Sequence, residues 1–426
     1  MQDNFEYLIL THSSLSGPAA SFASVYNIEI EESLRLTTHI IYADSVAVNY
    51  PDVDPEYAIW EQISTYINDI EGFKYLFILG DEILVPPIYD NYQIPSDDFY
   101  SSFDLSNPLP RVASGRIPVN SSIMAEGIVQ KLRSYLLTPT EGNWKSEIVL
   151  IADDAYKPSG DPLLEVTHVL SSNDLFQELN GLLQIDCIYG TDYEPYYGSG
   201  IPTLPEMTED IIDKINSGLA WLNYIGHGNE TTMGDELILD MERDLSLISS
   251  IEGKLPVWVV GSCDLGHYDN ADCFAENLMQ KPDGAIAVIS TTRLILSQSV
   301  NAFMTRLYSQ LTDYLLGINE SRLGDIIKDS KTGQTDYVFQ LFGDPAMPII
   351  LPRSNEIITN YPDSLEILSQ SHVSIENQNS DYSFIKVRGP DKLIHKQITD
   401  ILTIDYTLPG DLIFASNIDT QIDFYT

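Results

Sequence analysis

Apolar and polar positions along the chain follow two repeating patterns. Short runs of apolar, β-branched residues, typical of buried strands, alternate with longer segments whose apolar residues recur every three or four positions, as in amphipathic helices. The first pattern predicts strands at Phe5–Leu10, Thr38–Tyr42, Tyr75–Leu79, Glu147–Ala152, Gln184–Tyr189, Leu219–Ile225, Pro256–Gly261 and Ala285–Ser290. The second predicts helices at Pro55–Ile70, Ser122–Leu137, Pro205–Ser217, Ala271–Gln280 and Gln298–Leu316. Strands that alternate with helices favour an α/β fold with a parallel sheet.

Two changes in the pattern divide the chain into three parts. Turn-forming residues at Thr138–Gly142 separate a helix from a new strand, so we expect an N-terminal α/β subdomain at residues 1–140 and a second subdomain at residues 141–352. After Pro352, short runs of alternating polarity predominate, at Ser371–Glu376, Ser383–Val387, Leu402–Tyr406 and Gln421–Tyr425. They predict a β-sandwich-like C-terminal segment at residues 353–426, which is short for a complete sandwich.

Charge is the most unusual property of the composition. The chain has 63 Asp and Glu against 22 Lys and Arg, a formal net charge of −41. Such a surface repels phosphate backbones, which argues against nucleic-acid partners. Two interpretations of the charge remain open: a solvated acidic surface, or one in which some carboxylates hold structural Ca²⁺. Hydrophobic residues make up 43%, and no run approaches the ~20 apolar residues of a membrane helix, so we expect a soluble globular protein.

The cysteines and the first residues narrow the class of protein further. The three cysteines, Cys187, Cys263 and Cys273, are too few and odd in number for a disulfide framework. Neither a CxxC nor an HExxH spacing occurs, so no zinc site is predicted. Cys187 lies within a predicted strand and is interpreted as a core residue. Met1–Asn4 lacks the basic and apolar regions of a signal peptide, so we expect a segment of a longer protein.

A histidine and a cysteine each follow a strand that is predicted to be buried. Leu219–Ile225 ends next to His227, which lies between two glycines, and Pro256–Gly261 ends next to Cys263, 36 positions later (263 − 227). The carboxyl ends of parallel strands meet at one sheet edge, where ligands bind in α/β proteins. An imidazole beside a thiol favours the nucleophilic thiolate, and the amides of Gly228 and Cys263 are placed to bind an oxyanion. A lone histidine is more often a packed loop residue and a lone cysteine a buried hydrophobe, but the pair favours catalysis.

These motifs resemble the caspase-like clan of cysteine peptidases. Their surroundings resemble the gingipain family and, within it, the PorU-type sortases of type IX secretion systems. The resemblance covers about residues 5–352, and the paired His and Cys motifs are its most specific part. It also rests on Tyr75–Asp81, Ser96–Tyr100, Gly115–Val119, Ile151–Asp154, Gly261–Asp269, Gly284–Arg293 and Phe342–Ala346. It implies a caspase/gingipain-like parallel-sheet catalytic domain in two subdomains.

The resemblance implies roles for individual residues. His227 would be the general base and acid, Cys263 the nucleophile, and the amides of Gly228 and Cys263 the oxyanion hole. For the acid that orients the histidine, Asp154 is our choice and Glu165 the second candidate. Ordinary acids on a very acidic protein explain both carboxylates equally well.

Substrate contacts are expected from two other segments. Ser290, Thr291 and Arg293 lie at the end of the next predicted strand, and the resemblance implies that they wall the pocket for the residue before the cut. Arg293 suits bidentate binding of a carboxylate, although pairing with a local acid is the simpler expectation. Asp98 lies in a segment that resembles a family segment near the cleft, so it is a candidate contact for a substrate amine or Ca²⁺. His267 is interpreted as a loop residue.

We therefore expect a cysteine peptidase that acts through a thioester and needs no cofactor for its chemistry. The PorU-type resemblance implies a substrate protein with a C-terminal sorting signal, transfer to a surface glycolipid acceptor and other secretion-system components as partners. It also implies an extracellular or outer-membrane cell-surface location. Two alternatives remain open: a secreted gingipain-like endopeptidase, and a non-catalytic surface module stabilised by calcium.

Overall fold

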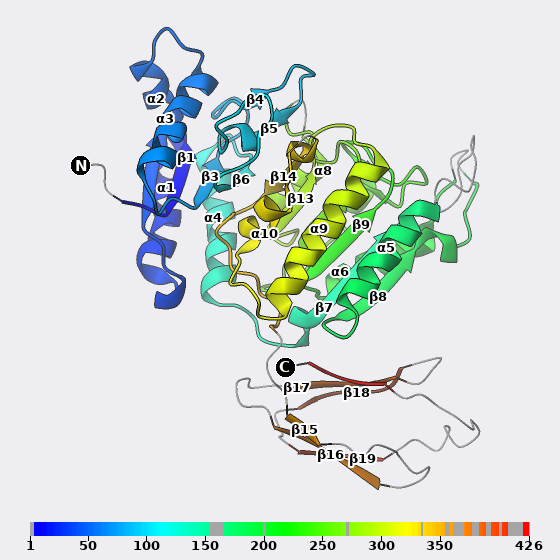
Figure 1. Ribbon diagram of the computed structural model, residues 1–426. Coiled ribbons are helices and arrows are strands. Elements are labelled where there is room, and N and C mark those ends of the chain that lie inside the picture. Colours follow the sequence, from blue (N-terminus) through cyan, green and yellow to red (C-terminus); the bar gives the residue numbers. More distant parts are fainter. Residues whose placement is uncertain are drawn as a thin grey trace.

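The computed structural model describes residues 4–153, 166–198, 202–269, 272–333 and 335–353, together with six strands between residues 358 and 425. Its centre is a ten-stranded sheet in the order β2-β1-β3-β6-β14-β13-β12-β9-β7-β8 (Figure 1). Helices cover both faces of this sheet, and most neighbouring strands are parallel. The predicted α/β fold class is therefore confirmed.

Parallel strands form the first half of the sheet. They are β1 Tyr7–Thr11, β2 Thr38–Tyr42, β3 Tyr75–Leu79 and β6 Ala113–Ile117. The helices of this half are α1 Ser16–Ser24, α2 Ala43–Asn49, α3 Pro55–Asp69 and α4 Ser122–Leu137. Two of them have clear start signals. Pro55 opens α3, where its missing N–H costs no hydrogen bond, and the Ser121 hydroxyl accepts the Met124 N–H at the start of α4.

The second half of the sheet carries the histidine and cysteine motifs. Its strands are β7 Glu147–Ala152, β8 Gln184–Tyr189, β9 Trp221–Ile225, β12 Val257–Gly261 and β13 Ala287–Thr291, all parallel. Strand β14, Phe339–Phe342, joins the halves because it is antiparallel to β13 and parallel to β6. Every residue of β9, β12 and β13 is buried, as expected for strands covered on both faces. Their carboxyl ends form one shared edge.

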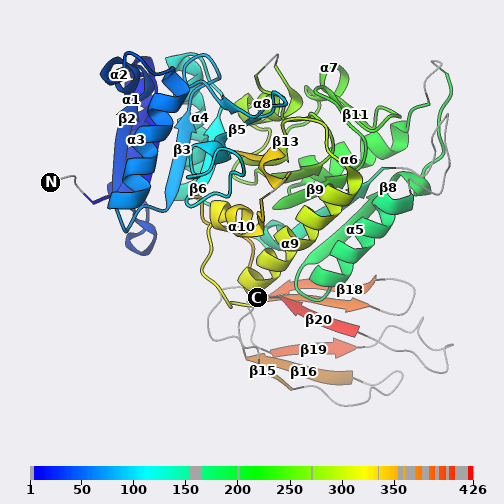
Figure 2. The same ribbon diagram turned by 45° about the horizontal axis from the view of Figure 1, so that its top comes forward.

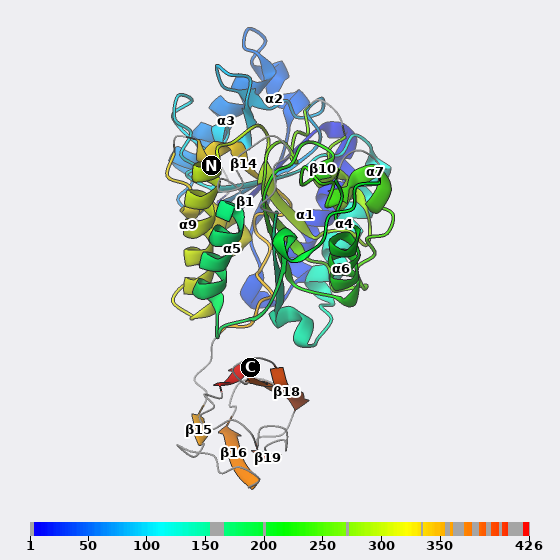
Figure 3. The same cartoon turned by 90° about the vertical axis from the view of Figure 1, so that its right-hand side faces the viewer.

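Two layers of helices enclose this half. The helices are α5 Val166–Leu179, α6 Pro205–Ser217, α7 Met241–Asp244, α8 Phe274–Gln280, α9 Ser297–Leu315 and α10 Leu323–Ser330. Figure 3 shows α5 and α9 on one side of the sheet and α4 and α6 on the other. Figure 2 shows α5 and α9 side by side, and the two helices are in contact. Trp221, Trp258 and Phe303 belong to one continuous apolar core.

Short strand pairs and a C-terminal β segment complete the fold. The short strands are β4 Ile88–Tyr89, β5 Pro95–Ser96, β10 Thr232–Met233 and β11 Leu239–Asp240. Two antiparallel sheets follow residue 353, formed by β15 Ile358–Asn360, β16 Gln370–Glu376, β17 Ser383–Arg388, β18 Leu393–Thr399, β19 Thr403–Thr407 and β20 Gln421–Tyr425. The proposed boundaries at residues 140 and 353 stay predictions. No helix among the described residues is long and apolar enough to cross a membrane.

Strands β6 and β14, which lie side by side in the sheet, were not predicted from the pattern. Strand β6 carries small residues and Arg116, a side chain that suggests an exposed position. Arg116 is instead fully buried, because Asp97 accepts two of its N–H groups at 2.7 and 2.9 Å and the Gly80 and Val85 carbonyls accept others. A charged residue interrupts the apolar run that would predict a buried strand, even where its partners make burial possible. A pattern based on hydrophobicity therefore misses β6. The helices α1, α2, α5 and α10 also went unpredicted.

Candidate active site

The register between β9 and β12 determines where His227 and Cys263 lie. Ile225, the last residue of β9, pairs with Gly261, the last residue of β12. His227 and Cys263 each come two residues after these partners, so both start from the same level of one sheet edge. They line a single cavity of about 120 Å³. The structure therefore brings together the two residues that the sequence singled out.

Hydrogen bonds hold the main chain of His227 on both sides. Its N–H donates to Asp153 Oδ2 at 2.8 Å. Its carbonyl accepts the Tyr224 hydroxyl at 2.8 Å and the Gly234 N–H at 2.9 Å. Asp153 is buried directly after β7, and its own N–H donates to the Ile225 carbonyl at 3.0 Å. Because neighbouring strands hold this turn in place, the remaining freedom of His227 lies in its side-chain torsions.

Glycines at the two strand ends allow close packing beneath the cavity. A Cβ on Gly226 would lie 2.3 Å from the Tyr224 hydroxyl oxygen and 2.6 Å from Asp153 Cβ. A Cβ on Gly261 would lie 2.6 Å from Val300 Cγ1. These separations are shorter than carbon and oxygen atoms tolerate without a bond, so a larger residue would displace the neighbouring chain. Both positions require glycine because the neighbouring atoms leave no space for a Cβ.

The cavity has mixed polar and apolar walls. Besides the two strand ends, it is lined by His168 of α5, by Ile295, and by Ser297, Val300 and Asn301 of α9. A larger hollow of about 500 Å³ lies over α6 and α7 and is lined by no histidine or cysteine. The smaller cavity is therefore the one that His227 and Cys263 line.

The Cys263 thiol contacts the main chain of Ile295. The Ile295 N–H donates to Sγ at 3.5 Å, and Sγ lies 3.6 Å from the Ile295 carbonyl oxygen. Burial raises the pKa of the Cys263 thiol, the Ile295 N–H lowers it, and the Asp264 carboxylate raises it further. This environment favours the protonated thiol. Asp264 itself has φ of +55°, in the left-handed region that ordinary side chains rarely adopt.

The predicted oxyanion donors lie on adjacent turns. A Cβ on Gly228 would be 2.8 Å from Ser262 Oγ, so the turn after β9 lies against the turn that carries Cys263. Gly228 forms a bridge with Met233, and the hydrogen bonds of this bridge come from Asn229 and Gly234. The Gly228 N–H is thus outside the bridge, as an oxyanion donor requires. The assignment of Gly228 and Cys263 as the oxyanion hole remains a prediction.

Asp153 is an acid in contact with His227 that the sequence analysis did not single out. Asp154 and Glu165, the predicted orienting acids, both lie outside the described residues. Asp153 accepts the backbone N–H of His227 and is buried. One signal could have identified it: it is the first polar residue after β7, at the same sheet edge as His227 and Cys263.

The residues predicted to wall the substrate pocket do not line the cavity that His227 and Cys263 share. Ser290 and Thr291 are fully buried in β13, and the Thr291 hydroxyl donates to the Ser262 carbonyl at 2.5 Å. Arg293 makes a bidentate ion pair with Asp269 at 2.7 and 2.8 Å, which fits the simpler expectation of a local acid. Among the described residues, the cavity wall comes instead from the segment that begins at Ile295. The assignment of Ser290, Thr291 and Arg293 to the substrate pocket remains a prediction.

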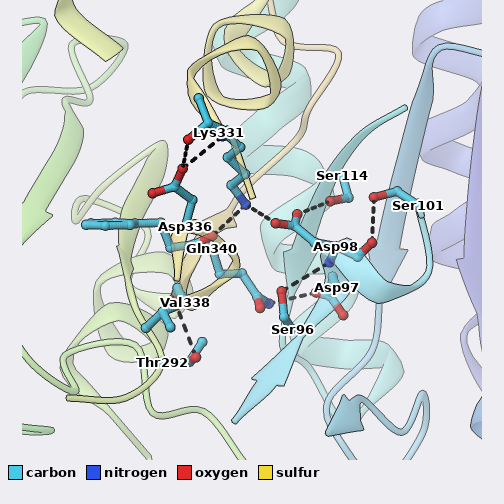
Figure 4. A network of polar contacts seen from close by, with 12 residues as sticks. Ser96, Asp97, Asp98, Ser101, Ser114, Thr292, Lys331, Asp336, Val338 and Gln340 are labelled. Atoms are coloured by element: carbon cyan, nitrogen blue, oxygen red, sulfur yellow. Dashed lines mark hydrogen bonds and ion pairs between the residues drawn. The ribbon is translucent and has the colours of Figure 1, made fainter. Parts of the chain in front are cut away.

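Asp98 lies in a buried polar network with Ser96, Ser114 and Lys331 (Figure 4). Its carboxylate accepts the Lys331 ammonium at 2.6 Å and the Ser114 hydroxyl at 3.4 Å, and its residue is 3% exposed. A buried carboxylate already paired with a lysine is poorly placed to bind an incoming amine. The surroundings of Asp98 therefore favour a structural role over the expected substrate contact.

The structure also shows where His267, the cysteines and the possible metal ligands lie. His267 lies among Glu230, Asp264 and Asp269, with nitrogen–oxygen distances of 3.4 to 3.7 Å. All three cysteines are free; Cys273 is buried, but Cys187 is exposed, so its interpretation as a core residue was wrong. Within the described ranges, no group of three or more His, Cys, Asp or Glu side chains could hold a metal ion. Structural Ca²⁺ remains a prediction.

The proteins to which this sequence is similar include two gingipains. Gingipain R2 of Porphyromonas gingivalis is 26% identical over 235 residues, which are 53% of this chain and 30% of that protein. Gingipain R1 of the same organism is 26% identical over 235 residues, 53% of this chain and 22% of that protein. The matches thus cover less than a third of the length of these relatives.

Solved structures agree on the fold. The crystal structure of the Arg-specific cysteine proteinase gingipain R has a TM-score of 0.67 and 18% identity, covering 99% of this chain and 96% of that one. The complex of Porphyromonas gingivalis RgpB pro- and mature domains gives 0.65 and 19%, covering 98% and 96%. The family model for peptidase family C25 matches residues 1–350. The chain therefore belongs to peptidase family C25, the gingipain family of cysteine peptidases.

Proposed function

We propose that Cys263 is the nucleophile and His227 the general base and acid of a peptidase that forms a thioester. The observation that carries the proposal is the paired register, which sets the two residues on one cavity at one sheet edge. An imidazole in this position accepts the thiol proton, so that the thiolate attacks the peptide carbonyl carbon. Amide donors from Gly228 and Cys263 stabilise the negative charge on the carbonyl oxygen.

The attack gives a tetrahedral intermediate, which then breaks down to a thioester and a free amine. The bond between the carbonyl carbon and the amide nitrogen breaks, and the His227 imidazolium gives its proton to the leaving amine. A thioester links Cys263 to the N-terminal part of the substrate. Either water or an amine attacks this thioester, which gives a free acid or a new amide bond and returns the thiol.

For the second step, the proposal is capture by an amine, as in a type IX secretion sortase. The support is that Gly284–Arg293 and Phe342–Pro345 resemble PorU-type proteins more than secreted proteases. The substrate would be a secreted protein with a C-terminal sorting signal, the acceptor a surface glycolipid, and the location the cell surface. Other secretion-system components would be partners. Two rival functions are a secreted gingipain-like endopeptidase and a non-catalytic surface module that retains the fold.

Competition between water and an amine tests this function. The enzyme is incubated with mixed peptides, including ones derived from C-terminal sorting signals, and with increasing concentrations of a simple amine, and the products are identified by mass spectrometry. A sortase gives an amine-ligated product that rises with amine concentration at the expense of the free acid. Only free acid, with broad cleavage of unrelated unfolded proteins, would establish the endopeptidase instead. Failure of wild type and Cys263→Ala alike to cleave any peptide, with no labelling of Cys263 by iodoacetamide, would favour the non-catalytic module.

A further inference from the structure

A second histidine lies beside His227 in the cavity. His168 is in the first turn of α5 and only 5% exposed. Its ring centroid lies 5.3 Å from that of His227, and the two ring planes meet at 83°. Both rings line the cavity that also holds Cys263. Such an edge-to-face arrangement is the one that aromatic rings prefer.

Helix α5 holds His168 firmly in this position. Leu175 and Leu179 of the same helix are buried in the main core. The Tyr189 hydroxyl, at the end of β8, donates to Asn173 Oδ1 of α5 at 3.1 Å. α5 also contacts β7, β9 and α9, which are the elements around the cavity. The ring of His168 is therefore a fixed surface against which the imidazole of His227 rests.

The contact matters because the rest of His227 is already fixed. Asp153, Tyr224 and Gly234 hold its main chain, which leaves two side-chain torsions to determine where the imidazole points. A perpendicular ring at this distance restricts the second of those torsions. Proton transfer requires the imidazole within hydrogen-bond reach of the thiol, and small misplacements of a catalytic group cost much of the rate.

We propose that His168 is a positioning residue, which holds the imidazole of His227 by edge-to-face ring packing in the orientation that serves Cys263. This inference rests on the proposed Cys263–His227 pair. It assigns His168 no contact with substrate and no proton transfer of its own. Ring shape and position, more than hydrogen-bonding capacity, then determine which residues can replace His168.

Alkylation of Cys263 by iodoacetamide tests the proposal without knowledge of the substrate. The rate is measured near neutral pH by mass spectrometry of each cysteine, because alkylation reports how readily the thiolate forms. His168→Ala should slow labelling of Cys263 roughly 2- to 12-fold, the range that an edge-to-face ring pair is worth. His168→Phe keeps a ring in place and should stay within about twofold of wild type. A wild-type rate in His168→Ala, or a rate in His168→Phe as slow as in His168→Ala, would overturn the proposal.

Three controls separate this result from other causes. Leu170→Ala changes an exposed side chain of the same helix that does not line the cavity and should leave the Cys263 rate unchanged; a loss equal to that of His168→Ala would show a generic effect of the helix and overturn the inference. Cys273 is buried, so its labelling reports unfolding. His227→Ala should slow Cys263 more than His168→Ala does. If His227→Ala has no effect, the catalytic pair fails; if it slows labelling while His168→Ala does not, only the positioning role fails.

Discussion

Ile225 and Gly261 are partners in the parallel ladder between β9 and β12, and this pairing explains why a histidine and a cysteine 36 positions apart (263 − 227) share one cavity. Each functional residue follows its strand by the same two steps. Because side chains keep their level across paired parallel strands, the geometry of the site is a consequence of sheet register.

The glycine before His227 is the position at which the site should tolerate least change. In Gly226→Ala, the added Cβ would meet Tyr224 and Asp153, the residues that hold His227 in place. We expect peptide turnover to fall more than about tenfold, because a small shift of a catalytic group has a large effect on rate. The matched control is Gly127→Ala, which adds the same atom in helix α4 with no neighbour within 4 Å. It should keep full activity with a slightly raised melting temperature; equal activity of both variants would contradict this account of Gly226.

The carboxylate after the nucleophile should hold back thiolate formation. Asp264 raises the pKa of the Cys263 thiol, so Asp264→Asn should lower that pKa and speed alkylation of Cys263 at a fixed pH below it. Asparagine also tolerates the left-handed backbone at this position, whereas Asp264→Ala adds strain. The measurement is the pH dependence of Cys263 alkylation, with the midpoint displaced to lower pH in Asp264→Asn. A midpoint that stays in place or moves upward would rule out this electrostatic role.

Asp153 should matter for both stability and rate. Asp153→Ala leaves the His227 N–H without its acceptor, which costs about 1–3 kcal/mol of unfolding free energy for a buried donor. Turnover should fall as well, because the turn that carries His227 loses its support. Asp153→Asn keeps an acceptor oxygen of the same shape and should lose less of both. Denaturant unfolding and peptide turnover measure the two effects, and an Asp153→Ala variant equal to wild type in both would contradict the role given to Asp153.

Bound calcium, if the protein uses it, should appear in the melting temperature. A formal net charge of −41 makes the folded state repel itself, and a cation that binds only the folded state stabilises it by mass action. EDTA should then lower the melting temperature, and added Ca²⁺ should restore it beyond what NaCl or Mg²⁺ of matched ionic strength achieves. Complete recovery in NaCl alone would mean that screening accounts for the effect and that no calcium site is involved.

The sequence predicted the parts of the site that follow continuous apolar strands. β9 and β12 are buried on both faces, so their continuous apolar runs predicted where each strand ends. His227 and Cys263 were identified because they follow these two strand ends. Asp153 also follows a predicted strand, but its role depends on a hydrogen bond from the backbone N–H of His227, 74 residues further along the chain (227 − 153). A local sequence pattern cannot predict such a contact. His168 was hidden for a similar reason: its importance depends on how α5 packs against β9.

The N-terminal half of the sheet shows a different limit. Strand β6 was missed because Arg116 looks like a surface residue until Asp97 is placed beside it. The role expected for Asp98 likewise depended on its partner, since Lys331 comes from a segment 233 residues further along the chain. Buried charge pairs form through tertiary contacts between distant segments, so hydrophobic periodicity cannot predict them.

Peptide turnover by Cys263→Ala tests the central claim most directly. With a peptide that the wild type cleaves, Cys263→Ala and His227→Ala should each lose nearly all turnover while keeping the wild-type melting temperature. Because the two residues act as one unit, the double variant should be scarcely worse than either single variant. Undiminished turnover by folded Cys263→Ala would contradict the assignment of the nucleophile and, with it, the mechanism proposed for this protein.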